Sequence, residues 1–150
     1  MEWLTALHGT TVGLDTAPLI YFIEEHHKYD QILTPFFEDL DAGKFRVVTS
    51  TVTLIEVLVH PLRNNDEALA RQYYDILLSS PHIDVVPVSL SVAERAAEVR
   101  ANFRLKTPDA IQVAGAMMYN ASALLTNDRE WPRGLGVPVL LIEDLLDQLN

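Results

Sequence analysis

Four acidic residues, widely spaced along the chain, are the side chains best suited to chemistry in this sequence: Asp15, Glu56, Asp109 and Asp128. Carboxylate oxygens are the ligands that Mg²⁺ and Mn²⁺ prefer, in near-octahedral geometry with several waters retained. Carboxylates gathered in one cleft repel each other unless cations offset their charge. The acids therefore predict a Mg²⁺ or Mn²⁺ site, provided that the fold brings them together.

Each acid also has a purely structural explanation. Asp15 could cap a following helix, and Glu56 has the spacing of a capping box with Thr53. Asp109 sits where an acid favours a helix dipole, and Asp128 could be a turn residue. Taken singly, these structural roles are favoured. Taken together, the acids favour the metal site, because helix capping does not require separate acids that converge on one edge.

Other side chains offer no competing site. The chain has no cysteine, which excludes disulfides and thiolate metal ligands and fits a reducing compartment. His26, His27 and His60 have no partners at the spacing of zinc ligands, so packing or solvated roles are favoured. No Ser-His or Cys-His arrangement for a nucleophile is recognisable.

Apolar runs and helical periodicities alternate along the chain. The runs predict β-strands over Thr11–Leu14, Phe45–Thr49, Ile83–Val88, Ala123–Thr126 and Val137–Leu140. The periodicities predict helices over Leu19–Glu24, Tyr29–Ala42, Thr51–Val59, Asp66–Leu78, Ser91–Phe103, Thr107–Tyr119 and Glu143–Leu149. This alternation predicts an α/β fold, a three-layer α/β/α sandwich around a parallel sheet of four to five strands.

Prolines and capping residues refine the expected ends. Pro61 is expected to end its helix, and Pro87 predicts that its strand lies at a sheet edge. Ser91 with Glu94 predicts a capping box. Thr107 is the expected N-cap of a helix that is apolar on nearly all sides and so should be buried.

In an open parallel sheet, ligands bind beyond the carboxyl ends of the strands. Asp15 and Asp128 follow two of the strands, and Glu56 lies on the helix directly after the second strand. Asp109 lies in the first turn of the helix that precedes the fourth strand, and the connection into that helix is not traceable from the sequence. We expect all of them at one edge, with the position of Asp109 the least determined.

Length and charge limit the class of protein. A chain of 150 residues predicts one domain over residues 1–150. The net charge of −10 argues against a general nucleic-acid binder, although metal ions would cancel part of it. Six of the eleven basic residues fall within residues 95–133, on what could equally be solvated helix faces: Arg95, Arg100, Arg104, Lys106, Arg129 and Arg133. No apolar run suits a membrane span and residues 1–9 lack a basic region, so we expect a cytoplasmic protein.

Four segments of the sequence resemble the PIN domain family, in particular the VapC-type toxins of bacterial and archaeal toxin–antitoxin pairs. They are residues 14–16, 53–58, 107–114 and 124–131, and their order and separations are similar to the family's over nearly the whole chain. Trp131 stands where a Phe is more usual.

The resemblance implies a metal-dependent endoribonuclease that hydrolyses RNA, with Asp15, Glu56, Asp109 and Asp128 as catalytic metal ligands for Mg²⁺ or Mn²⁺. It implies supporting roles for Thr16 and Thr126. It also implies an antitoxin partner and a homodimer. The side chains that we expect to hold the RNA backbone are Arg100, Arg104, Arg129 and Arg133.

Three alternatives remain. An Asp-based phosphatase usually has a second acid two residues after its nucleophile, but Ala17 occupies that position, and Gly134-Leu135-Gly136 is too short for a phosphate loop. A non-catalytic PIN-fold binding module is a second possibility. A metal-binding interaction module, using the helices Leu19–Glu24 and Asp66–Leu78 as an antitoxin or dimer surface, is compatible with nuclease activity.

Overall fold

The predicted strands form one sheet in which every neighbouring pair is parallel. The computed structural model describes residues 1–150 and gives the strand order β3-β2-β1-β4-β5. The strands are β1 (Thr11–Leu14), β2 (Arg46–Ser50), β3 (Ile83–Val86), β4 (Ala123–Thr126) and β5 (Val139–Leu141). Pro87 follows β3 at an edge of the sheet, as the sequence predicts. The parallel sheet of the predicted α/β class is confirmed.

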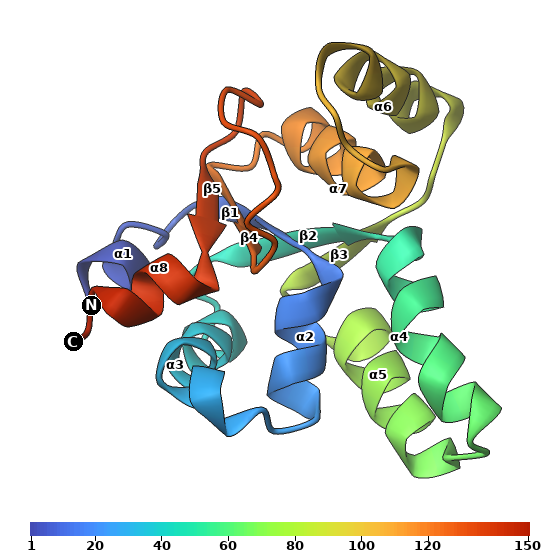
Figure 1. Cartoon of the computed structure of the whole chain (residues 1–150). Helices are drawn as coiled ribbons and strands as arrows, with labels where there is room; N and C mark the ends of the chain where they lie inside the picture. Colours follow the sequence, from blue (N-terminus) through green and yellow to red (C-terminus); the bar gives the residue numbers. More distant parts are fainter.

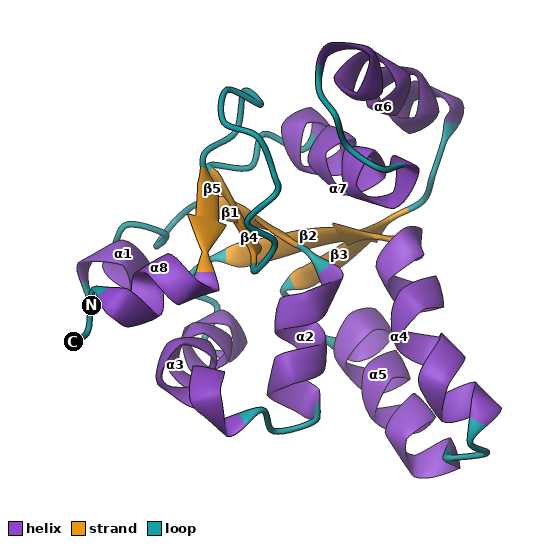
Figure 2. Cartoon of the chain, viewed as in Figure 1, coloured by secondary structure: helices purple, strands orange, loops and turns teal.

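Helices cover both faces of this sheet (Figures 1 and 2). One face carries α6 (Leu90–Asn102) and α7 (Thr107–Met118). The other carries α2 (Thr16–Ile23), α3 (Asp30–Asp41), α4 (Thr51–Arg63) and α5 (Glu67–Ser79), and the short helices α1 (Glu2–Thr5), η1 (His27–Tyr29) and α8 (Ile142–Asp147) complete the chain. The buried apolar residues accordingly divide into two clusters, one on each side of the sheet. This is the expected three-layer sandwich.

Three helix ends that were predicted from a proline or a capping residue are wrong. α4 does not stop before Pro61 but runs through it to Arg63. The proline lies in the last turns and is buried, so packing compensates for the one backbone hydrogen bond that its missing N–H removes. α6 begins at Leu90, because the side chain of Ser89, and not Ser91, accepts the N–H of Val92 at 3.2 Å.

The start of α7 differs in the same way. Lys106 is its N-cap, and Thr107 is its first helical residue. The Thr107 hydroxyl instead accepts a 2.9 Å hydrogen bond from Arg100 Nη1, which ties the end of α6 to the start of α7. As predicted, α7 is largely buried. Several other ends shift by a few residues: α2 begins earlier than expected, and β5 and α8 differ at both ends, whereas β1 and β4 have the predicted bounds.

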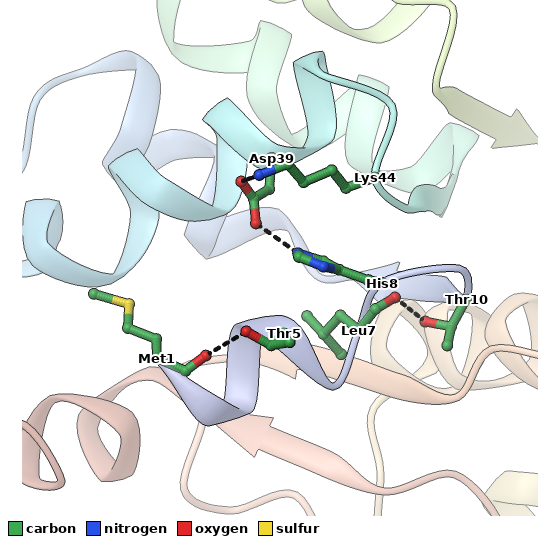
Figure 3. A network of polar contacts seen from close by, with 7 residues as sticks. All are labelled: Met1, Thr5, Leu7, His8, Thr10, Asp39 and Lys44. Carbon is green, nitrogen blue, oxygen red and sulfur yellow. Dashed lines mark hydrogen bonds and ion pairs between the residues drawn. The ribbon is translucent and has the colours of Figure 1, made fainter.

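The short helix α1 was not predicted, and polar contacts attach the segment after it to α3 and the loop that follows (Figure 3). Nε2 of His8 lies 2.8 Å from Oδ2 of Asp39, and Lys44 Nζ donates to Oδ1 of the same carboxylate at 2.8 Å. Hydrogen bonds from Lys44 and then His8 hold the pKa of Asp39 below its usual value. The amino-terminal segment is thus fixed beside the sheet, away from its carboxyl edge.

A close approach between α7 and the central strand sets the position of that helix. A Cβ atom placed on Gly13 of β1 would lie 2.9 Å from the Cβ of Ala116 and 3.2 Å from Leu124 Cγ. Glycine therefore allows α7 to pack directly on the backbone of β1. Because α7 runs antiparallel to the strands, its first turn, with Asp109, lies at their carboxyl edge.

No helix in the structure is both long enough and apolar enough to cross a lipid bilayer.

Candidate active site

An open pocket of about 650 Å³ lies at the carboxyl edge of the sheet. All four acids singled out in the sequence line it. Its full lining is Asp15, Thr16, Ala17, Ile20, Tyr21, Glu56, Asp109, Asn127, Asp128, Arg129 and Glu130. The acids come from four separate segments, namely the end of β1, α4, the first turn of α7 and the loop after β4. The structure thus brings together the four predicted acids, including Asp109.

Asp15 is the most enclosed of the acids, with 9% of its surface exposed. It is the N-cap of α2, and its Oδ1 accepts the N–H of Thr16 at 2.8 Å. Its Oδ2 accepts a 2.7 Å hydrogen bond from the hydroxyl of Thr126, at the end of β4. Burial raises the pKa of Asp15, and the charges of Glu56 and Asp128 act in the same direction.

Glu56 is held from α2 and not by a capping box. The hydroxyl of Thr16 donates to Glu56 Oε1 at 2.7 Å. Thr53, its expected capping partner, is a fully buried residue within α4, whose N-cap is Ser50. The two supporting threonines inferred from the sequence therefore each contact an acid: Thr126 contacts Asp15, and Thr16 contacts Glu56.

The pKa of Asp109 reflects its burial and the negative charges around it. Its pKa is raised to about 6, first by burial and then by the charges of Asp15, Asp128 and Glu56, while Lys106 lowers it. The surrounding acids therefore act on Asp109 as like charges at close range. A helix-dipole role alone would lower this pKa, so the structural explanation of Asp109 does not describe its surroundings.

Asp128 has a turn role and faces the pocket as well. Its Oδ1 accepts the N–H of Glu130 at 2.9 Å, and its own N–H donates to Thr126 Oγ1 at 3.2 Å. The single hydroxyl of Thr126 thus contacts both Asp128 and Asp15. Likewise, Asp15 is both a helix cap and a pocket residue, so the structural and chemical explanations coexist for these two acids.

The donor atoms fit a hydrated, hard divalent cation. No group of three or more His, Cys, Asp or Glu side chains in this structure is arranged closely enough to hold a bare metal ion. Mg²⁺ commonly keeps several waters and binds directly through one or two carboxylates, so a wide carboxylate-lined pocket suits it better than a tight cage. After burial, repulsion by the other acids contributes to the raised pKa of Asp109, and a cation in the pocket would relieve that repulsion.

The four predicted RNA-binding arginines lie at different distances from the pocket. Arg129 lines it, and also lines a second hollow of about 410 Å³ that includes Arg133 and shares Asp128. Arg100 is engaged elsewhere, because its side chain donates to the carbonyl of Leu105 and to Thr107. Neither Arg100 nor Arg104 lines either hollow.

A buried polar network beneath the pocket was not foreseen. Gln112, on α7 one turn after Asp109, accepts a 2.9 Å hydrogen bond from the Ser50 hydroxyl and donates to Thr53 Oγ1. Thr53 lies 3.0 Å from the hydroxyl of Thr16, which in turn holds Glu56. The network therefore joins three helices that carry or flank the acids. The only sequence signal was a lone glutamine in an otherwise apolar helix.

Comparison with known proteins identifies the fold. A family model described as the PIN domain matches residues 12–134. The chain belongs to the PIN domain family. The resemblance inferred from the four acidic segments is confirmed. Comparison with curated proteins gives no match.

Several solved structures similar to this PIN domain come from toxin–antitoxin systems. VapBC2 from Rickettsia felis, bound to a DNA fragment from its promoter, matches with a TM-score of 0.68 and 18% identity, over 87% of this chain and 98% of that chain. A toxin–antitoxin complex from Klebsiella pneumoniae matches with a TM-score of 0.66 and 25% identity, over 89% and 98%. VapBC-5 from Mycobacterium tuberculosis matches with a TM-score of 0.56 and 21% identity, over 88% and 98%.

These findings define a coarse function. The fold is that of the VapC-like PIN domains, which are generally nucleases and generally use divalent metal ions.

Proposed function

We propose that this PIN domain is a Mg²⁺- or Mn²⁺-dependent endoribonuclease that hydrolyses RNA phosphodiester bonds, with Asp15, Glu56, Asp109 and Asp128 as its metal-binding catalytic residues. The observation that carries the proposal is that acids from four distant segments line one pocket, where burial and then the charges of the other three acids raise the pKa of Asp109 to about 6. Such an arrangement costs free energy unless it serves a positively charged ligand.

The four acids would position the cation. Asp15 is held at both oxygens, by the Thr16 N–H and the Thr126 hydroxyl, which fixes its orientation. Glu56 is held at one oxygen, which leaves the other for a metal or a water. When bound, the cation would acidify a water and stabilise negative charge on the phosphate. A neighbouring carboxylate could accept the proton from that water.

Arg129 and Arg133 are suited to hold the RNA backbone. Arg129 lies at the rim of the acidic pocket, and Arg133 lines the adjoining hollow, so an RNA strand could pass from one to the other. Arginine binds phosphate oxygens through a planar fork of donors. Arg100 and Arg104 lie outside both hollows and would contact only a longer RNA.

Toxin action is part of the same proposal. The Rickettsia and Klebsiella complexes pair a similar fold with an antitoxin, which supports a protein antitoxin as the partner of this chain. A homodimer stays a prediction from the family resemblance, and a cytoplasmic location stays a prediction from the sequence. The alternative Asp-based phosphatase gains no support, since Ala17 lines the pocket where such an enzyme would place a second acid.

The test is cleavage of end-labelled single-stranded and structured RNA by the purified protein in Mg²⁺, in Mn²⁺ and in EDTA. Asp15→Asn and Asp128→Asn variants are assayed beside it, with Asp84→Asn as a control for the loss of one negative charge far from the pocket. Cleavage that requires metal, survives in Asp84→Asn and is lost in both site variants supports the nuclease and its site. Measurable Mn²⁺ binding without cleavage of any RNA favours the non-catalytic binding module, and absence of Mn²⁺ binding contradicts the four-carboxylate site.

A further inference from the structure

The loop that carries Asp128 is held from two distant parts of the chain through its neighbour Asn127. The side-chain N–H group of Asn127 donates to Tyr29 Oη at 3.1 Å. Its side-chain oxygen accepts the backbone N–H of Glu143 at 3.2 Å. Both the N–H group and the oxygen of the Asn127 amide are therefore hydrogen-bonded, and neither partner is one of the four pocket acids.

The second contact completes a helix. Glu143 lies in the first turn of α8, where backbone N–H groups have no partner within the helix. No side chain of α8's own N-cap supplies one, so Asn127 does so from the loop after β4. The position of the loop is thereby coupled to the amino-terminal end of α8.

Tyr29 and Glu143 also contact each other. Tyr29, 6% exposed, donates from its hydroxyl to Glu143 Oε1 at 2.7 Å, and Lys28 Nζ donates to the same oxygen at 2.7 Å. The tyrosine oxygen thus accepts from Asn127 and donates to the Glu143 side chain, while Asn127 accepts from the Glu143 backbone, which gives a closed ring of three residues from η1, α8 and the Asp128 loop. Each member is fixed by the other two.

We propose that this ring of Tyr29, Asn127 and Glu143 is a positioning device for Asp128, so that Tyr29 and Glu143 govern cation binding without touching the cation. The inference rests on the proposed function, since it assumes that Asp128 is a metal ligand. It also assigns a role in the site to α8, which lies beyond the residues matched by the family model. Some residues hydrogen-bond to a metal ligand without touching the metal. Removing such a residue commonly lowers metal affinity or activity by about 10- to 100-fold.

The test measures Mn²⁺ affinity of the full-length protein by titration calorimetry or by the electron paramagnetic resonance of free Mn²⁺, without RNA. Tyr29→Phe removes one hydroxyl and keeps the ring that stacks on Tyr21. We expect it to weaken Mn²⁺ binding about 10-fold. Tyr73→Phe is the matched control, because Tyr73 is a fully buried tyrosine whose hydroxyl donates to a carboxylate, that of Glu24, away from the pocket. It should leave Mn²⁺ affinity unchanged.

A double-mutant cycle separates positioning from general destabilisation. If Tyr29 acts through Asp128, Tyr29→Phe should have little further effect on Mn²⁺ affinity in the Asp128→Asn background. Glu143→Ala should also weaken binding, and Glu143→Gln, which keeps an acceptor for Tyr29, should restore most of it. Equal effects of Tyr29→Phe in both backgrounds, or none in either, would overturn the positioning role.

The same data distinguish failure of this inference from failure of the proposed function. If Asp128→Asn weakens Mn²⁺ binding but Tyr29→Phe and Glu143→Ala do not, the ring is not a positioning device and the metal site stands. If Asp128→Asn leaves Mn²⁺ affinity at its wild-type value, both proposals are wrong.

Discussion

The hydroxyl of Thr126 donates a 2.7 Å hydrogen bond to Oδ2 of Asp15, and so joins the ends of the two neighbouring strands β4 and β1. The donor is fully buried, and the hydrogen bond acts to lower the pKa of a carboxylate that burial otherwise raises. Thr126 therefore helps to keep Asp15 ionised and oriented, as a metal ligand must be.

Replacing Thr126 by valine should weaken both the fold and the site. We expect Thr126→Val to lower the free energy of unfolding by about 1–3 kcal/mol, because Asp15 Oδ2 loses its partner in a buried position. Mn²⁺ affinity should fall about 10-fold. Urea denaturation and Mn²⁺ titration measure the two effects. Thr126→Ser keeps the hydroxyl and should recover most of the affinity, and a serine variant as weak as the valine variant would contradict this role.

The stability of the metal-free protein should depend on pH through Asp109. Its folded pKa of about 6 lies above the ordinary value of 3.8, so the folded state holds this proton more tightly than the unfolded chain does. The resulting stabilisation is complete below pH 3.8 and is lost as the pH rises through about 6. Urea denaturation in EDTA across this interval should show a declining free energy of unfolding, and Asp109→Asn should flatten the decline. An unchanged slope in the variant would exclude Asp109 as the cause.

Asp144 should restrain the binding of RNA. Its Oδ1 lies 3.5 Å from Nη1 of Arg129, and both side chains are more than half exposed. Asp144→Asn should free Arg129 for phosphate and tighten RNA binding about 2- to 5-fold at low salt. Fluorescence anisotropy in the Asp15→Asn background measures binding without cleavage. Asp84→Asn makes the same charge change beside Arg46, and an equal gain there would mean that net charge alone is responsible.

Gln112 should contribute to the stability of the folded protein through its hydrogen bond with Ser50. Gln112→Leu would leave the Ser50 hydroxyl without its acceptor in a buried position, at a cost of about 1–3 kcal/mol in the free energy of unfolding. Ser50 is also the N-cap of α4, so Ser50→Ala has a cost of its own. In the Ser50→Ala background, which lacks that hydroxyl, Gln112→Leu should therefore lower the free energy of unfolding by less than it does in the wild type, as measured by urea denaturation. An equal cost of Gln112→Leu in both backgrounds would contradict this explanation.

The strands and the acids were predictable because their signals are local. The bounds of β1 and β4 agree with the apolar runs that predict them, and Asp15 directly follows the first of these strands. The edge at which Asp109 lies was the least determined, because two helices, α6 and α7, lie between β3 and β4 and the connection into α7 is not traceable from the sequence. The other inferences need only periodicity and handedness.

The capping residues and the supporting contacts were not predictable, because tertiary partners decide them. Thr107 is a residue type that often caps helices, yet its hydroxyl accepts a hydrogen bond from Arg100. The N-cap of α7 is Lys106, one residue earlier than predicted. Tyr29 contacts Glu143 across 114 residues of sequence, and no local pattern relates them. Gln112 likewise finds its partners only after α7 has packed on the sheet.

The order of the strands has a consequence for the time at which the protein becomes active during its synthesis. β1 is complete by residue 14, but its partner β4 begins at Ala123, and the ring that holds Asp128 needs Glu143. A nascent chain that has not yet emerged from the ribosome beyond these residues lacks a central strand and one acid of the pocket. The proposed nuclease would therefore stay inert until the chain is free to fold through β4, Asp128 and Glu143.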